Sequence, residues 1–243
     1  MKTLVLGASG ATGKLLVQQL LNKEHEIKIV VRSLEKIPKS WKENSSIEII
    51  HASILDLSTT EMIDLTENCS SIVSCLGHNL NWKGIYGKPR KLVTDAAQRL
   101  CDAVGKNKIT KPVKYILMNT TGNRNIDLDE KISFGQKCVL ALLRLMLPPH
   151  VDNEKAAKYL SKEIGQHNKH IEWTAVRPDG LTDEERVSQY QVYQSPTRSA
   201  IFDAGKTSRI NVGNFMTRLI DEQDLWEKWK GKMPVIYNAN CDG

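Results

Sequence analysis

The chain has 243 residues, of which 40% are hydrophobic and 26% are charged, and its formal net charge is +6. This length suits one large α/β domain or two small ones, and the composition is that of an ordered globular protein. Lys and Arg are spread among Glu and Asp without a basic run, so we expect no nucleic-acid partner. The apolar run at the start is too short for a signal peptide, and the most apolar stretch, residues 138–147, is too short to span a bilayer. We therefore predict a cytoplasmic protein without a membrane partner.

The five cysteines favour neither a metal site nor a disulfide framework. Their number is odd and none of them forms a C-x-x-C pair, a spacing that many zinc and redox sites use. We expect no bound metal, and we interpret these residues as small buried hydrophobic side chains. They are Cys69, Cys75, Cys101, Cys138 and Cys241.

Apolar runs with the length of strands alternate with longer amphipathic stretches up to about residue 178. This alternation is typical of βαβ units, whose parallel strands are buried on both faces. It predicts an α/β fold: a Rossmann-type, doubly wound, mostly parallel sheet with helices on both faces. The predicted strands cover residues 2–6, 26–31, 47–50, 70–75, 113–118 and 171–177, and the predicted helices cover residues 12–22, 58–67, 88–106 and 152–168.

Two stretches depart from this alternation. Residues 122–131 are polar, and the apolar helix after them must end at Pro148 and Pro149, because proline does not continue a helix. This stretch is interpreted as an insertion beside the site. We find no internal repeat or linker, so residues 1–243 are expected to form a single domain in which residues 179–243 add a small lobe on the substrate side. In that lobe we predict a polar loop to Arg198, a strand over residues 200–202, a helix over residues 212–221 and a final strand over residues 234–237.

The most informative segment follows the first predicted strand. Gly7, Gly10 and Gly13 recur at a spacing of three between that strand and the next helix. The first glycine allows a tight turn, the second lets a pyrophosphate approach the backbone, and the third lets the helix pack closely. Free N–H groups at the helix N-terminus favour phosphate, so this context predicts a dinucleotide site rather than a flexible turn without a ligand. The predicted cofactor contacts are Gly7, Ser9, Gly10, Ala11, Thr12 and Gly13.

The end of the second predicted strand indicates which dinucleotide is bound. The residue at this position faces the adenosine ribose, where an acidic side chain favours NAD and an arginine accommodates a 2′-phosphate. Here the residue is Arg32, followed by Ser33 and Lys36, which add a hydroxyl and a further positive charge. The alternative is an ordinary exposed arginine at a strand end. We predict that NADP(H) is preferred over NAD(H).

The glycine turn has the spacing G-x-x-G-x-x-G and is accompanied by Val31-Arg32-Ser33, Asp56-Leu57, Cys75-Leu76-Gly77 and the segment 173–181. Together these motifs resemble the atypical short-chain dehydrogenase/reductases. More narrowly, the chain is similar to their NAD(P)H-binding group related to NmrA-like proteins and biliverdin reductase B. The resemblance covers nearly the whole chain, and its motifs are most specific at the two ends.

The resemblance implies further contacts with the cofactor. From the residues alone, ordinary explanations stay open: Asp56 could cap a helix, and Gly77 and the segment 178–180 could form simple turns. The implied contacts are Asp56 and Leu57 with the adenine, Cys75, Leu76 and Gly77 with the ribose, Thr120 with the nicotinamide, and Pro178, Gly180 and Leu181 with its carboxamide.

The orthodox members of that superfamily use a Tyr-x-x-x-Lys pair, in which the lysine holds the ribose and the tyrosine passes a proton to the substrate. The lysine that best matches is Lys155, but four residues earlier stands Val151. His150 lies next to the vacant position and could act as the general acid, because its ordinary pKa suits that task. The alternative is that His150 is an exposed loop residue.

The loop after the fourth predicted strand contains His78, Asn79, Trp82 and Tyr86. In open α/β sheets this loop borders the crevice at the carboxyl ends of the strands, where ligands bind. These residues could therefore form the wall of a substrate pocket, or simply a surface loop with an aromatic anchor.

Two functions remain open at this point. The first is an NADP(H)-dependent oxidoreductase that transfers hydride to a small carbonyl, quinone or flavin-like acceptor. The second, supported by the missing tyrosine, is a non-catalytic NADP(H) sensor like the NmrA-like regulators, which requires different affinities for the two redox states of the cofactor. A nucleotide-sugar epimerase is disfavoured because such enzymes rely on the same tyrosine. The expected partners are a small-molecule substrate of unknown identity and, at most, a second copy of the chain.

Overall fold

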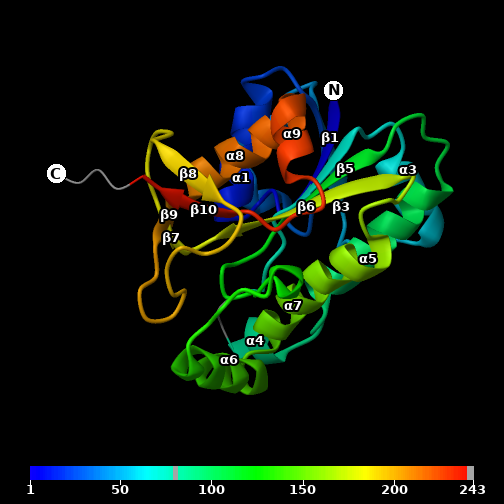
Figure 1. The fold of residues 1–243 in the computed structure, drawn as a ribbon. Helices are drawn as coiled ribbons and strands as arrows, with labels where there is room; N and C mark the ends of the chain where they lie inside the picture. The colour runs from blue at the N-terminus through cyan, green and yellow to red at the C-terminus, as the bar shows by residue number, and fades with distance from the viewer. Residues whose placement is uncertain (79–81, 240–243) are drawn as a thin grey trace.

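Eight strands form the central sheet of the computed structural model, which describes residues 1–78 and 82–239 (Figure 1). Their order is β3-β2-β1-β4-β5-β6-β10-β8, and neighbours pair in parallel except for β10 and β8. The runs predicted as strands up to residue 178 all lie in this sheet, buried by helices on both faces. The strands are β1 (Lys2–Leu6), β2 (Glu26–Val31), β3 (Ile47–His51), β4 (Ser71–Ser74), β5 (Val113–Met118), β6 (Ile171–Pro178), β8 (Tyr190–Tyr193) and β10 (Val235–Asn238).

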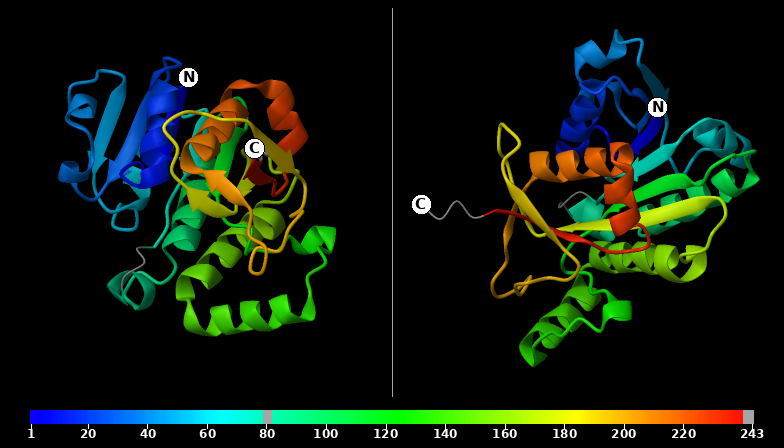
Figure 2. Two further views of the ribbon diagram at one scale, coloured as in Figure 1. Left: turned by 90° about the vertical axis from the view of Figure 1, so that its left-hand side faces the viewer. Right: turned by 45° about the horizontal axis from the view of Figure 1, so that its top comes forward.

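Helices cover both faces of the sheet (Figure 2). On one face α3, α5 and α7 enclose a core that includes Leu4 and Val93, and on the other α1, α8 and α9 enclose a core that includes Leu16 and Phe215. The doubly wound Rossmann fold predicted from the sequence is confirmed. The helices are α1 (Ala11–Leu21), α2 (Lys39–Lys42), α3 (Thr59–Thr66), α4 (Trp82–Tyr86), α5 (Leu92–Lys106), α6 (Phe134–Met146), α7 (Pro148–Tyr159), α8 (Arg209–Asp221) and α9 (Gln223–Trp229), with short helical turns η1 (Leu34–Lys36), η2 (Ile126–Leu128) and η3 (Leu160–Ile164).

Two predicted helices have different boundaries in the structure. The helix predicted over residues 88–106 is shorter: α5 begins only at Leu92, and α4 is a separate short helix before Pro89. Pro148 and Pro149 open α7 instead of only ending the helix before it, because a proline in the first turn has no intrahelical N–H bond to lose. His150 therefore lies in the first turn of α7 and not in a loop.

The carboxyl-terminal lobe contains more strand than the sequence predicted. The stretch interpreted as a polar loop includes β8 and β7 (Gly180–Thr182), and β7 pairs in parallel with β9 (Lys206–Ser208). The strand predicted over residues 200–202 is wrong. Ser199 Oγ accepts hydrogen bonds from the N–H groups of Ile201 and Phe202, and such local side-chain contacts close a turn instead of a strand.

The apolar stretch at residues 138–147 lies mostly in α6, which buries only Gln136 and Leu140. Cys138 is exposed on this helix, so the interpretation of the cysteines as buried side chains is wrong at this position. Cys69 and Cys101 are buried, Cys75 is partly buried, and Cys241 lies outside the described residues. None of the helices in the described ranges is long and apolar enough to cross a membrane.

Candidate functional site

The glycine turn is held by close backbone contacts. Gly7 has a φ of +72°, and a Cβ atom there would lie 2.4 Å from the carbonyl oxygen of Cys75. A Cβ atom at Gly13 would lie 2.1 Å from the carbonyl oxygen of Gly7, whereas one at Gly10 would have only that oxygen nearby, at 3.2 Å. The first and third glycines are therefore needed for packing, and the second leaves the turn accessible to a ligand.

The N-terminus of α1 is suited to a phosphate group. Its N-cap is Gly10, which has no side chain to cap the helix, and its first turn contains no acidic residue. The first hydrogen bond within the helix runs from Lys14 N–H to Gly10 O at 2.9 Å, so the N–H groups of Ala11, Thr12 and Gly13 precede it. Free N–H groups and the positive end of the helix dipole attract anions.

A cleft of ≈ 550 Å³ runs from this turn across the carboxyl ends of β1, β2, β3 and β4. Arg32, Ser33 and Lys36 lie together in the cleft, after the end of β2. Its lining includes most of the residues predicted to contact the phosphates and ribose. The cleft is lined by Leu6, Gly7, Ser9, Gly10, Val30, Val31, Arg32, Ser33, Lys36, Ala52, Ser53, Ile54, Cys75, Leu76, Gly77 and Leu92.

The residues after β3 that line the cleft differ from those implied by the resemblance. Asp56 is exposed, and Leu57 is buried in the core with its carbonyl oxygen bonded to Arg99. Ala52, Ser53 and Ile54 line the cleft instead, because β3 ends at His51 and the next residues directly border the edge of the sheet. Asp56 and Leu57 lie too far along the connection to α3.

His78 follows the cleft residue Gly77, and its side chain is buried against α7. His78 Nε2 lies 2.8 Å from Asp152 Oδ2, and the side chains of these residues are 5% and 0% exposed. The Asp152 carboxylate also accepts hydrogen bonds from the N–H groups of Val93 and Thr94 in the first turn of α5. Burial alone would raise the pKa of Asp152, but these hydrogen bonds outweigh it and lower that pKa. Asp152 thus ties the loop after β4 and the start of α5 to α7.

Two further residues predicted in that loop, Trp82 and Tyr86, do not line the cleft. Trp82 and Tyr86 stack with ring centroids 5.4 Å apart on α4, and 82% of Trp82 is exposed. The Tyr86 hydroxyl donates a hydrogen bond to Met146 O on α6. Asn79 lies outside the described residues.

The turn after β5 brings Thr120 close to His150. A Cβ atom at Gly122 would lie 3.7 Å from Thr120 Oγ1, 3.4 Å from His150 Cε1 and 3.8 Å from His150 Nδ1. His150 Nε2 lies 3.4 Å from Glu154 Oε1, and the His150 side chain is 11% exposed. The Glu154 carboxylate is held on its other side by Arg144, at 2.8 to 3.1 Å.

This arrangement fixes the charge of Glu154. Burial alone would raise its pKa, but the contacts with His150 and Arg144 outweigh burial and lower the pKa to about 2. Glu154 therefore stays ionised near neutral pH and orients the His150 ring, as a carboxylate does in many catalytic pairs.

Lys155 is not brought into the cleft. It is exposed and lines a separate cavity of ≈ 220 Å³ together with Val151 and Lys158. The helix turns its Asp152 and Ala156 face toward the core, and residues four apart share a face. The positions of the Tyr-x-x-x-Lys pattern consequently lie outside the cleft.

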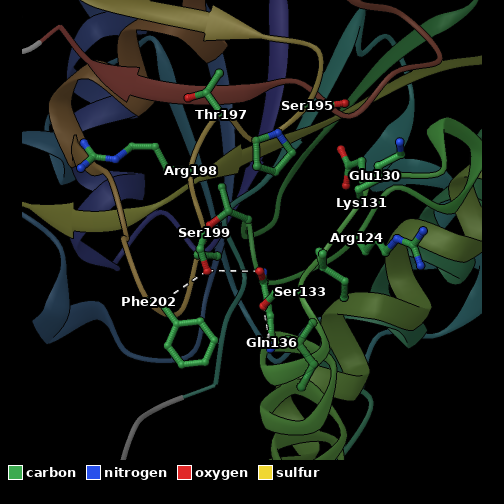
Figure 3. Close-up of a pocket in the computed structure, with 16 residues that line it drawn as sticks. Arg124, Glu130, Lys131, Ser133, Gln136, Ser195, Thr197, Arg198, Ser199 and Phe202 are labelled. Atoms are coloured by element: carbon green, nitrogen blue, oxygen red, sulfur yellow. Dashed lines mark hydrogen bonds between the residues drawn. The ribbon is translucent and has the colours of Figure 1, made fainter.

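A further cavity, of ≈ 330 Å³, opens beside the turn that carries Thr121 and Gly122 (Figure 3). One wall is the insertion before α6 with the start of that helix, and the other is the lobe loop 195–202. Ser199 Oγ and Gln136 Oε1 hydrogen-bond across it at 3.1 Å. We call it the lobe pocket. Its lining residues are Thr121, Gly122, Arg124, Glu130, Lys131, Ile132, Ser133, Gln136, Leu140, Ser195, Pro196, Thr197, Arg198, Ser199, Ala200 and Phe202.

A buried ion pair fixes both walls of the lobe pocket. Arg177 is fully buried in β6 and forms two hydrogen bonds with the Glu130 carboxylate, at 2.7 and 2.9 Å. The same guanidinium donates to the carbonyl oxygens of Asn123, Met233 and Gln194. This role of Arg177 was not predicted from the sequence, although a charged residue inside the apolar run 171–178 signals a buried partner.

The last residues implied by the resemblance lie in the lobe. Pro178 ends β6, and its carbonyl oxygen accepts a hydrogen bond from Thr121 N–H at 3.1 Å. Gly180 and Leu181 belong to β7 and pair with β9. Neither the cleft nor the lobe pocket is lined by these three residues.

Comparison with known proteins agrees with this geometry. A family model described as NAD(P)H-binding matches residues 7–223. An uncharacterized chloroplastic protein of Arabidopsis thaliana is 30% identical over 185 residues, which are 75% of this chain and 60% of that protein. The chain thus spans less than two thirds of the length of this curated relative.

Solved structures share the fold at low sequence identity. The oxidoreductase ylbE of Lactococcus lactis has a TM-score of 0.69 at 19% identity, covering 99% of this chain and 92% of its own. A Veillonella parvula short-chain dehydrogenase/reductase in complex with NADP has a TM-score of 0.69 at 15% identity, covering 98% and 95%. The anaerobillin reductase ChuY of Escherichia coli O157:H7 has a TM-score of 0.69 at 16% identity, covering 100% of both chains. The chain belongs to the NAD(P)H-binding family and has the Rossmann-like fold of short-chain dehydrogenase/reductases.

Proposed function

We propose that the protein is an NADP(H)-dependent oxidoreductase that transfers hydride to a small carbonyl, quinone or flavin-like acceptor. The observation that carries this proposal is the cleft, in which an open glycine turn and the Arg32, Ser33 and Lys36 cluster lie at the places where a dinucleotide has its phosphates. Free backbone N–H groups at α1 fit the pyrophosphate, and a guanidinium beside an ammonium group fits a 2′-phosphate.

The proposed preference for NADP(H) rests on the positive charge at the end of the cleft where Arg32 and Lys36 lie. Arg32 and Lys36 are exposed there, and among the described residues no acidic side chain lines the cleft. An Asp or Glu that would bond the ribose hydroxyls of NAD(H) is therefore missing from the lining. The cluster favours NADP(H) through two positive charges and the Ser33 hydroxyl.

Transfer of hydride from bound NADPH to the acceptor leaves the acceptor in need of a proton. His150 is the side chain that supports this step, because its ring and the Thr120 hydroxyl both lie within 4 Å of the position that a Gly122 side chain would take. His150 Nε2 faces Glu154 Oε1 at 3.4 Å and Nδ1 lies 3.8 Å from the Gly122 Cβ position, so in this proposal Nδ1 gives the proton to the reduced oxygen or nitrogen of the acceptor, and solvent then reprotonates the ring. Lys155, on the other face of α7, has no part in this proposal.

The test begins with calorimetric titration of NADPH, NADH, NADP and NAD into wild type and Arg32→Ala. We expect tight binding of the phosphorylated forms and a loss of about 10- to 100-fold in their affinity in the variant, since a hydrogen bond to a charged group contributes about 1.5–3 kcal/mol. Arg186→Ala removes an exposed arginine outside the cleft and is the matched control. Equal affinities for NADPH and NADH would contradict the proposed preference.

Turnover is then followed at saturating NADPH with aldehydes, quinones and flavins. In His150→Gln we expect a lower kcat and an unchanged NADPH affinity, because glutamine cannot supply the proton. A panel without any turnover, together with unequal affinities for NADP and NADPH, would instead support the non-catalytic redox sensor.

A further inference from the structure

The lobe pocket lies next to Thr120 and His150, where the proposed oxidoreductase would react. Thr121 and Gly122 line the pocket, and they directly follow Thr120 in the turn after β5. Thr121 is also bonded to Asp179 through its hydroxyl, at 2.9 Å, which holds the insertion against the lobe. A ligand that fills the pocket therefore reaches the edge of the sheet where Thr120 and His150 meet.

The positive and negative charges of the side chains that line the pocket do not cancel. Arg124, Lys131 and Arg198 line it, whereas within residues 1–78 and 82–239 Glu130 is its only acidic lining residue. The charge of Glu130 is matched by the buried guanidinium of Arg177 behind the wall. The pocket is thus left with a surplus of positive charge, and a concave surface of one sign concentrates ligands of the opposite sign.

Arg124 and Arg198 each have an ion-pair partner that competes only weakly with a ligand. Arg124 pairs with Asp129, which is 91% exposed, and Arg198 pairs with Asp203, which is 60% exposed. Exposed pairs of this kind contribute little because water and salt screen them. Lys131 is exposed and forms no ion pair with any of the described residues.

A donor in the pocket wall also lacks an acceptor. Within the described part of the chain, Arg124 Nε is buried and makes no hydrogen bond. An unmatched buried donor is costly, and an anionic group at Arg124 would supply the acceptor. Figure 3 shows Arg124 and Lys131 on the same side of the pocket as Glu130, with Phe202 on the opposite side.

The opposite side offers contacts to apolar atoms. Phe202 is 62% exposed although it lines the pocket, and Leu140 beside it is buried. The Phe202 ring also lies 3.5 Å from the position of a Cβ atom at Gly135, at the start of α6. An exposed ring that borders a cavity is suited to packing against an apolar ligand.

We infer that the lobe pocket binds the anionic end of the hydride acceptor, so that the enzyme prefers conjugated acceptors that carry a phosphate or carboxylate group. Arg124 and Lys131 hold the anion, Arg198 adds charge at the opposite wall, and the apolar part of the acceptor packs toward Phe202. This inference rests on the proposed oxidoreductase function. The reaction it concerns consumes NADPH, one proton and the acceptor, and yields NADP and the acceptor reduced by two electrons.

The experiment uses two pairs of acceptors that share their reacting group. FMN and riboflavin differ by a phosphate, and 4-carboxybenzaldehyde and benzaldehyde differ by a carboxylate. At saturating NADPH and low salt we expect a kcat/KM about 10-fold higher for the anionic member of at least one pair, declining as salt is added. The pair that shows the preference distinguishes phosphate from carboxylate as the group that is bound.

Variants link that preference to the pocket. Lys131→Glu reverses a charge on an exposed side chain and is expected to abolish the preference, and Arg198→Ala is expected to weaken it. Lys169→Ala removes an exposed lysine that lines neither cavity and should keep the preference. Equal kcat/KM values within both pairs, or a preference unchanged in Lys131→Glu, would overturn the inference.

Failure of the inference can be told apart from failure of the proposed function. Binding of FMN and riboflavin to the NADP-loaded protein is measured by quenching of flavin fluorescence, which needs no turnover. If no acceptor is reduced, the oxidoreductase function is refuted, and tighter binding of FMN that is lost in Lys131→Glu would still support the anion site. Equal affinities of FMN and riboflavin would refute the anion site unless the carboxylate pair shows the preference in kcat/KM.

Discussion

The dinucleotide cleft and the lobe pocket are built in different ways. The cleft is made by short segments that each follow a parallel strand, and its closest contacts join backbone atoms, such as Gly13 against Gly7 O. The lobe pocket is made by side chains from the insertion and from the lobe, held together by Arg177 and Glu130. The cleft therefore depends on the absence of a side chain at a few glycines, whereas the lobe pocket depends on one buried ion pair.

The largest effect is expected from Glu130→Gln, which breaks the support of the lobe pocket. Removing one partner of a buried ion pair leaves the other charge uncompensated and costs about 3–5 kcal/mol. We expect that loss in the free energy of unfolding measured with urea. Asp203→Asn, which breaks an exposed pair with Arg198, should cost under about 1 kcal/mol. Similar losses in the two variants would mean that the Arg177 pair does not stabilise the lobe.

Gly13→Ala tests the cleft by disturbing the close backbone contact between Gly13 and Gly7. The added Cβ atom would lie 2.1 Å from Gly7 O, so the turn or α1 must shift, at a cost of about 1–3 kcal/mol. Calorimetry should show a loss of NADPH binding even where the variant is folded. The control is Gly105→Ala in α5, where a Cβ atom has no neighbour within 4 Å and the exchange should stabilise the helix by about 0.5–1 kcal/mol. NADPH affinity unchanged in Gly13→Ala would disprove the proposed phosphate turn.

Asp152→Asn tests how the loop after β4 and the start of α5 are held against α7. The amide cannot accept from His78 and from the N–H groups of Val93 and Thr94 as the carboxylate does, and an unsatisfied buried group costs about 1–3 kcal/mol. Thermal unfolding measures this loss, with Asp102→Asn, an exposed position on α5, as the control. Retention of full stability would show that Asp152 does not anchor the start of α5.

The smallest expected effect is on the pH dependence of the free energy of unfolding. The pKa of Glu154 is lowered to about 2 in the folded protein, so its ionised form favours folding at pH values above the ordinary carboxyl range. That contribution is lost as the pH falls from about 5 toward 2. Denaturant titrations at several pH values should show a smaller loss over this window in Glu154→Gln than in wild type. Parallel losses would refute the role of Glu154 in orienting His150 through its charge.

The sequence by itself determined the alternation of strands and helices up to residue 178 and most of the cleft. Glycine spacing, the position of Arg32 and the apolar runs are local features, and parallel strands carry the residues after them to one edge of the sheet. Only the tertiary structure decided the rest. It placed residues 52–54, and not Asp56 and Leu57, in the lining of the cleft, put Lys155 in a separate cavity, and brought His150 within 3.4 Å of Glu154. It also joined Arg177 to Glu130 across the chain. Those outcomes depend on which face of a helix packs on the core and where a strand ends, and no local pattern in the chain specifies either.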